Sequence, residues 1–156
     1  MKPNTYFTNQ QLFTQALTHR SYCNEHPGMT SNERLEFLGD AVLSLIMSSR
    51  LYHLLPDKPE GELTARRSLA VQTSTLATKS KELGLDELIL LSRGEEDGGG
   101  RNNPSLLANT FEAVLGALYL DRGLKTCQKY LAEIFLGSLT SEHGNTMTSI
   151  LIVRYS

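Results

Sequence analysis

Residues 32–56 read NERLEFLGDAVLSLIMSSRLYHLLP, a run in which apolar side chains recur at almost every position of a helix. Ser31 or Asn32 suits the cap at its start, and Pro56 cannot continue a helix at its end. A helix that is apolar on all sides is normally buried at the centre of a fold. We therefore predict a long, central and buried helix that ends near Leu55.

The remaining sequence up to residue 137 carries helix signals and lacks the apolar–polar alternation of strands, which predicts an all-α fold. Asn103 and Pro104 suit the start of another long helix, and the DRG at residues 121–123 interrupts it. The predicted helices cover residues 9–18 (capped by Thr8), 62–70, 74–83 (ended by Gly84), 104–120 and 124–136 (ended by Gly137), with one or two turns over 85–91. We expect loops over residues 26–31 and 92–102, the second one flexible.

Four oxygen-bearing side chains interrupt two of the most apolar stretches. Glu36 and Asp40 lie in the first, and Asn109 and Glu112 lie in LLANTFEAVL, residues 106–115. Acids are rarely buried unless they are paired or bound to a metal ion. Glu33, Glu36 and Asp40 follow i, i+3, i+7 spacing and so share one helix face, as do Asn109 and Glu112 at i, i+3. Two packed helices could therefore direct these groups to one point.

Oxygen donors without His or Cys suit Mg²⁺ or Mn²⁺, ions that activate water and stabilise charge on a reacting phosphate. Simpler interpretations of the single residues remain open. Glu33 is also well placed to interact with a helix dipole, Glu112 with a buried arginine, and Asn109 with backbone groups.

Composition narrows the class of protein. The chain has 156 residues, 40% of them hydrophobic, and a net charge of −2, which argues against nucleic-acid binding through bulk positive charge. The residues Arg66, Arg67, Lys79, Lys81, Arg93 and Arg101 could still form a local basic patch or belong to an ordinary solvated surface.

Cys23 and Cys127 are expected to be free thiols rather than a disulfide. The N-terminus lacks an apolar signal core, so we expect a cytoplasmic location without membrane association.

Several segments closely resemble the endonuclease domain of the ribonuclease III family. The resemblance covers roughly residues 8–137. It is carried by HRS (19–21), NERLEFLGDA (32–41), EGEL (60–63), LANTFEA (107–113) and GALYLD (116–121).

This resemblance implies an all-α homodimer that cleaves double-stranded RNA with Mg²⁺ (Mn²⁺ as a substitute) and leaves 5′-phosphate and 3′-hydroxyl ends with short 3′ overhangs, in the processing of ribosomal or messenger RNA. It assigns metal binding to Glu36, Asp40, Asn109 and Glu112, and catalysis to Asp40, Glu112, Glu33 and Glu60. It places Phe37 across the dimer interface, although a plain core phenylalanine is the alternative.

The sequence departs from the family in two places. Asn109 stands where many members have Asp, which removes a negative charge and is expected to weaken metal binding. After a nuclease domain at residues 1–137, the segment 138–156 does not resemble the double-stranded RNA-binding domain of bacterial members, so we expect a short tail outside the core. We expect RNA phosphate contacts from Arg66, Arg67 and Arg101, and a carboxylate partner for Arg34.

Two other functions fit the pattern. A non-catalytic module for RNA binding or dimerisation on the same fold would fit the Asn at 109. Another α-helical metal–carboxylate enzyme, such as a nucleotide pyrophosphohydrolase, would fit the spacing of the acids, although the second motif makes it the weaker alternative.

Overall fold

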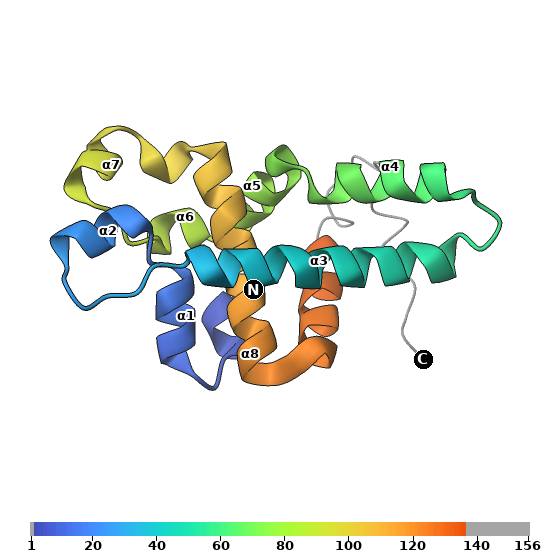
Figure 1. The fold of residues 1–156 in the computed structure, drawn as a ribbon, viewed down its shortest axis with the longest axis horizontal. Helices are drawn as coiled ribbons and strands as arrows, with labels where there is room; N and C mark the ends of the chain where they lie inside the picture. Colours follow the sequence, from blue (N-terminus) through green and yellow to red (C-terminus); the bar gives the residue numbers. More distant parts are fainter. Residues whose placement is uncertain (1, 137–156) are drawn as a thin grey trace.

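The two longest helices, α3 (Glu33–Leu54) and α8 (Pro104–Leu136), cross at the centre of the fold and share its largest helix–helix interface (Figure 1). The computed structural model describes residues 2–136. α3 has the bounds predicted from the sequence to within a residue. Asn103 starts α8 as predicted, because its Oδ1 accepts hydrogen bonds from the backbone N–H groups of Ser105 (2.9 Å) and Leu106 (3.2 Å).

The crossing of α3 and α8 depends on two glycines that face each other. A Cβ on Gly39 would lie 1.7 Å from the carbonyl oxygen of Glu112, and a Cβ on Gly116 would lie 2.2 Å from the carbonyl oxygen of Leu35. Both distances are far inside van der Waals contact, and the atoms met are backbone atoms that side-chain rotation cannot move. The two backbones therefore touch, and only glycine at both positions allows this separation.

Shorter helices pack around this crossing, and the predicted all-α class is confirmed. Within residues 2–136 the bridge between Thr18 and Leu90 is the single extended pairing. The surrounding elements are η1 (Pro3–Tyr6), α1 (Gln10–Ala16), α2 (Arg20–Glu25), α4 (Glu60–Val71), α5 (Thr73–Glu82), α6 (Leu85–Leu88), α7 (Arg93–Asp97) and η2 (Gly100–Asn102).

α8 folds back on itself at the predicted break. Gly123 has φ 76° and ψ 177°, a conformation that glycine adopts far more readily than other residues. Figure 1 shows residues 124–136 running back beside the first part of the helix. The Cys127 thiol there donates to the carbonyl oxygen of Leu115 at 3.7 Å. The hairpin-like turn thus brings a second layer of apolar side chains into the core.

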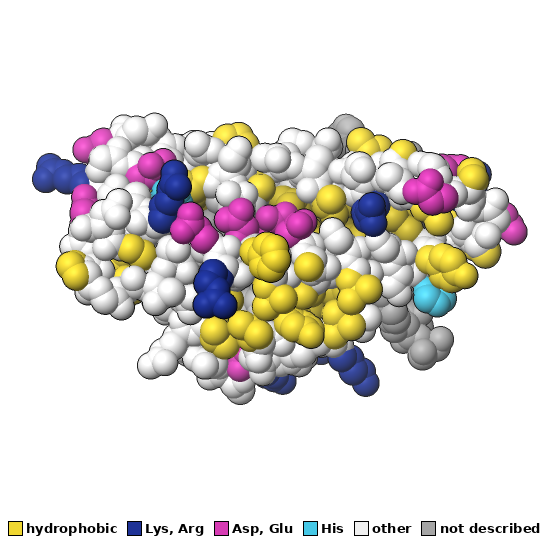
Figure 2. All heavy atoms as spheres, viewed as in Figure 1, with side chains coloured by type: hydrophobic (Ala, Val, Ile, Leu, Met, Phe, Trp, Pro, Cys, Tyr) yellow, Lys and Arg dark blue, Asp and Glu magenta, His cyan; other side chains and the backbone are white. Residues whose placement is uncertain are grey.

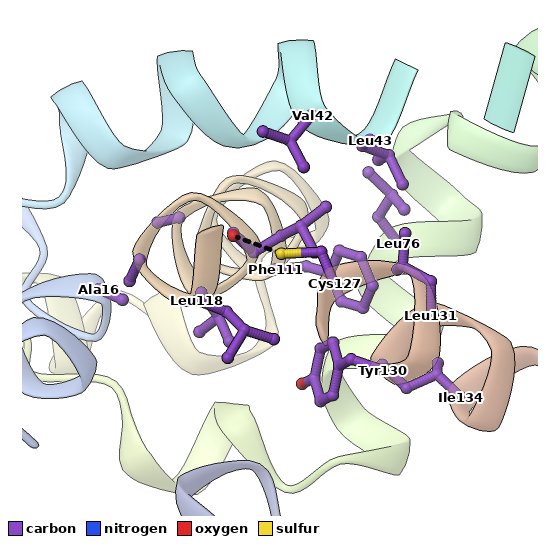
Figure 3. Close-up of a cluster of buried hydrophobic side chains, with 14 of the residues drawn as sticks. Ala16, Val42, Leu43, Leu76, Phe111, Leu118, Cys127, Tyr130, Leu131 and Ile134 are labelled. Atoms are coloured by element: carbon purple, nitrogen blue, oxygen red, sulfur yellow. Dashed lines mark hydrogen bonds between the residues drawn. The ribbon is translucent and has the colours of Figure 1, made fainter. Parts of the chain in front are cut away.

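The core gathers side chains from α1, α3, α5 and both parts of α8 (Figure 3). Cys127 is completely buried within it, and burial raises the pKa of its thiol to about 12. Both cysteines are free thiols, as predicted. No helix between residues 2 and 136 combines the length and apolar character needed to cross a membrane.

Three local predictions were wrong. Asn9, not Thr8, caps the first helix, since its side chain accepts from the backbone of Gln11 and Leu12. Thr8 instead donates its backbone N–H and its hydroxyl to the carboxylate of Asp121, both at 2.7 Å. Residues 92–102 form α7 and η2 rather than a flexible loop, and α2 was not predicted. The segment expected as a tail, 138–156, lies outside the described residues, as does Gly137.

α3 is also not buried on all sides. Phe37 is 82% exposed, Tyr52 69% and Leu45 56%, although the sequence predicted a helix enclosed by the core. The interpretation of Phe37 as a core residue is therefore wrong. Figure 2 shows a broad apolar patch on this face, beside a row of acidic side chains. An apolar surface of this kind marks an interaction site more often than a free one.

The glycine crossing makes a direct prediction. Gly39→Ala should lower the free energy of unfolding by at least about 3 kcal/mol, because the methyl group forces the two helices apart. The matched control is Gly61→Ala in α4, where an added Cβ meets no atom within 4 Å. It should change stability by no more than about 1 kcal/mol. Urea unfolding measures both, and equal stabilities would contradict the role given to Gly39.

Candidate metal centre

The acidic side chains of α3 lie along its first three turns and meet one acid of α8. Glu33 and Asp40 are exposed and Glu36 is half-buried. Glu112 is half-buried on α8, and its own backbone carbonyl is the atom packed against Gly39. The glycine contact thus sets Glu112 beside the turn of α3 that carries Glu36 and Asp40. Figure 2 shows acidic side chains as a row across this face.

The charges of these acids act on one another. Burial of its side chain and, after it, the nearby carboxylates of Asp40 and Glu36 together raise the pKa of Glu112 to about 7. Burial, Glu33 and Asp40 likewise raise the pKa of Glu36. Within residues 2–136, no salt bridge involves Glu36, Asp40 or Glu112. The carboxylates therefore repel one another without a protein cation between them, and the alternative of a buried arginine partner for Glu112 is not met.

The predicted metal ligands are more exposed than the sequence indicated. The sequence suggested deeply buried acids, but Asp40 and Asn109 are exposed and the other two are only partly enclosed. Mutual repulsion, not burial alone, makes the site favourable for a positive ion. Across the described part of the chain no three His, Cys, Asp or Glu side chains already converge as a metal cage. The donors fit Mg²⁺ in chemical type, and Mg²⁺ commonly keeps several water ligands with only one or two carboxylates.

Comparison with known proteins decides the family. The sequence profile of the Ribonuclease-III-like family matches residues 9–139, which is most of the chain. This chain belongs to the ribonuclease III family.

Relatives and a solved structure agree with that assignment. Ribonuclease 3 of Roseiflexus sp. is 44% identical over 145 residues, 90% of this chain and 61% of the relative. Ribonuclease 3 of Bacillus cytotoxicus is 52% identical over 130 residues, 82% of this chain and 53% of the relative. The chain thus spans between half and two thirds of the length of these curated relatives.

The solved structure confirms the all-α nuclease-domain fold. It is the nuclease domain of ribonuclease III from Campylobacter jejuni, which shows structural flexibility in a region involved in dimer formation. Its TM-score is 0.79 at 35% identity, and the match covers 84% of this chain and 89% of that one.

Within this ribonuclease III fold, the remaining predicted site residues lie apart from the acids. Glu60 is the first residue of α4, where its carboxylate accepts from the Thr64 hydroxyl at 2.7 Å. It lines a groove with Ser49, Tyr52 and other residues near the end of α3. One chain alone therefore does not bring Glu60 to Asp40, whereas Glu33 lies on the same helix face as Glu36.

The three arginines predicted to contact RNA already have partners in the fold. Arg66 binds Glu62 through Nε (3.0 Å) and Nη2 (2.6 Å), and Arg67 donates to the Ser48 hydroxyl at 2.9 Å. Arg101 binds Glu96 at 2.6 Å and donates to the carbonyl oxygen of Asp86 at 2.8 Å. Arg101 thus ties η2 to α6 and α7. RNA contacts by these side chains remain a prediction, and each would need to exchange or share a present partner.

Sequence reasoning missed the cation that does approach the acidic row. Arg34 was expected to pair with a carboxylate, but within residues 2–136 no salt bridge involves it. Glu33 pairs instead with Arg20 of α2, whose Nη1 lies 3.9 Å from Oε1. Its signal was the HRS segment at residues 19–21, which was noted for resemblance and not for charge.

The raised pKa of Glu112 predicts an unusual pH dependence in chelator. Its pKa of about 7 in the folded state exceeds the ordinary value of 4.5, so the folded state retains a proton that the unfolded state releases. Stability should therefore fall as the pH rises from about 4.5 to about 7. Glu112→Gln removes the titratable group, so the variant should gain stability over the parent as the pH rises. Each 1 kcal/mol of difference in unfolding free energy should appear as a Tm difference of about 2–4 °C.

The comparison between parent and variant is needed because burial lowers the pKa of His19, which acts in the opposite direction. Thermal unfolding of both proteins near pH 5.5 and pH 7.5 makes the measurement. A Tm difference that is the same at both pH values would contradict the electrostatic description of this site.

Proposed function

We propose that this chain is the catalytic domain of an Mg²⁺-dependent endonuclease that cleaves double-stranded RNA. The observation that carries the proposal is the juxtaposition of Glu36 and Asp40 of α3 with Glu112 of α8 in a ribonuclease III fold. The relatives named above are ribonucleases, and the acids of this site are oxygen donors that suit Mg²⁺ or Mn²⁺. Products with 5′-phosphate and 3′-hydroxyl ends and short 3′ overhangs follow from the family, as does a part in ribosomal or messenger RNA processing.

Glu36, Asp40, Asn109 and Glu112 would hold the ion, which when bound activates water and stabilises charge on the phosphate. Glu112 must give up its proton for this, and because its pKa is raised to about 7, it does so only as the pH rises through about 7. Asn109, exposed one turn before Glu112, offers an amide oxygen without a charge. Glu33 would act next to these ligands, at the edge nearest α2.

The proposal includes a homodimer formed through the exposed face of α3. Phe37 is 82% exposed and borders a pocket of about 640 Å³ that Leu12, Leu38 and Leu120 line in part. An exposed aromatic side chain beside an apolar pocket suits self-association about a twofold axis, where each copy fills the pocket of the other. Glu60 lies away from the acids of its own chain, near the end of α3. A dimer would allow it to lie near the acids of the second copy instead.

Cleavage of long duplex RNA tests the enzyme. The parent should cut with Mg²⁺ and stop with chelator, and Glu112→Gln should lower the rate by at least about 100-fold because a metal ligand is lost. Glu87→Gln, an exposed acid of α6, is the control and should cut at the parental rate.

A folded parent that binds duplex RNA but never cuts it would instead support the non-catalytic module. Normal cutting by Glu112→Gln would contradict the metal assignment. Circular dichroism on each variant shows whether folding is intact.

The dimer has its own test. Phe37→Ala should raise the dimer dissociation constant by at least about tenfold, as truncation of a buried aromatic anchor does. Leu88→Ala removes another exposed apolar side chain, on α6, and should leave dimerisation unchanged. Sedimentation equilibrium measures both. Parental dimerisation by Phe37→Ala would exclude this face as the interface.

A further inference from the structure

Arg20 stands at the end of the acidic row and is the first residue of α2. Its side chain is 74% exposed, and its Nη1 lies 3.9 Å from Oε1 of Glu33, itself 58% exposed. A pair this long and this exposed stabilises a protein little. The guanidinium group is therefore close to the acids but only weakly held by them.

The position of Arg20 is set by contacts of neighbouring residues in and before α2. The Ser21 hydroxyl accepts from the backbone N–H of Ser92 at 3.0 Å, and the Glu25 carboxylate accepts from the backbone N–H of Arg93 at 3.2 and 3.3 Å. His19, which caps α2, accepts the Ser21 N–H on Nδ1 at 3.2 Å. These bonds hold the backbone of α2 against the start of α7. The guanidinium group of Arg20 is only weakly paired and can change partner.

The arginines expected to contact RNA are engaged more firmly. Arg66 and Arg101 each make a 2.6 Å bond to a carboxylate, and Arg101 also bonds to backbone carbonyl oxygens. A phosphate would have to displace those partners, whereas Arg20 gives up a single contact near 4 Å. The planar guanidinium group also matches two phosphate oxygens at once.

We propose that Arg20 contacts a backbone phosphate of the RNA duplex beside the acidic row. This rests on the proposed function, since it assumes that duplex RNA occupies that face. A polyanion lying over Glu33, Glu36 and Asp40 is repelled wherever no cation intervenes. Arg20 supplies a positive charge at one end of the row and exchanges the carboxylate of Glu33 for phosphate when RNA binds.

Binding measurements on a chain that does not cut test this. Fluorescence anisotropy with a short perfect RNA duplex, in Mg²⁺ and in the Glu112→Gln background, should show about 5- to 10-fold weaker binding after Arg20→Ala. The slope of log K against log salt should also fall by about 1, as loss of one phosphate contact requires. Arg20→Lys should keep the slope and recover part of the affinity, because the charge remains.

Lys129→Ala is the matched control. Lys129 is 73% exposed and lies 4.0 Å from the carboxylate of Glu133, on the second part of α8. Its removal deletes the same charge and the same kind of weak ion pair, so a general effect of net charge would appear in both variants. We expect parental affinity and parental salt slope for Lys129→Ala.

A double variant separates direct contact from an effect through Glu33. If Arg20 only orients Glu33, then Arg20→Ala should have no effect on RNA affinity in the Glu33→Gln background. Direct contact predicts that the loss persists there. Parental salt slope after Arg20→Ala, with parental RNA cleavage intact, would overturn this inference alone, whereas absence of both binding and cleavage in the parent would overturn the proposed function as well.

Discussion

The backbones of α3 and α8 touch at Gly39 and Gly116, and this contact positions both the core and the acids. It lets α3 and α8 approach until the carbonyl oxygen of Glu112 occupies the space that a side chain would fill at position 39. The same contact lies within one helical turn of Glu36 and Asp40, so it also fixes how near the acids of the two helices come. Packing and site geometry therefore share one cause: neither glycine can change without moving the carboxylates.

The carboxylates of this site repel one another, and this repulsion makes the site attractive to a cation. Burial first, and then the carboxylates of Asp40 and Glu36, raise the pKa of Glu112, so ionising this group in the fold without a counter-ion costs free energy. A divalent ion would remove that repulsion, and metal binding would then stabilise the fold through linkage. A polyanion bound over these acids would also be repelled by them, and the weakly held Arg20 offers a positive charge where the acidic row ends. Repulsion among the acids thus favours a positive ion within the site and a cationic side chain beside it.

Local signals made much of the fold predictable from the sequence. Asn103 with Pro104 marked the start of α8, Gly123 its break, and the apolar run after Asn32 the length of α3. Contacts distant in sequence were not predictable in this way. Thr8 was wrongly predicted as a helix cap because its hydroxyl bonds to Asp121, a residue far away in the sequence. The segment around Arg101 was wrongly predicted to be flexible because the side chain of Arg101 bonds to a distant backbone carbonyl. The acids were found by spacing, but their exposure was misjudged, because an apolar run does not reveal that Phe37 faces outward.

We propose that acids from α3 and α8 hold the same divalent ion. Isothermal titration of Mn²⁺ into the parent, Asp40→Asn and Glu112→Gln measures whether they do. The parent should bind Mn²⁺, and each variant, one on each helix, should lose at least about tenfold in affinity while remaining folded. Parental affinity in either variant would show that the two helices do not share an ion.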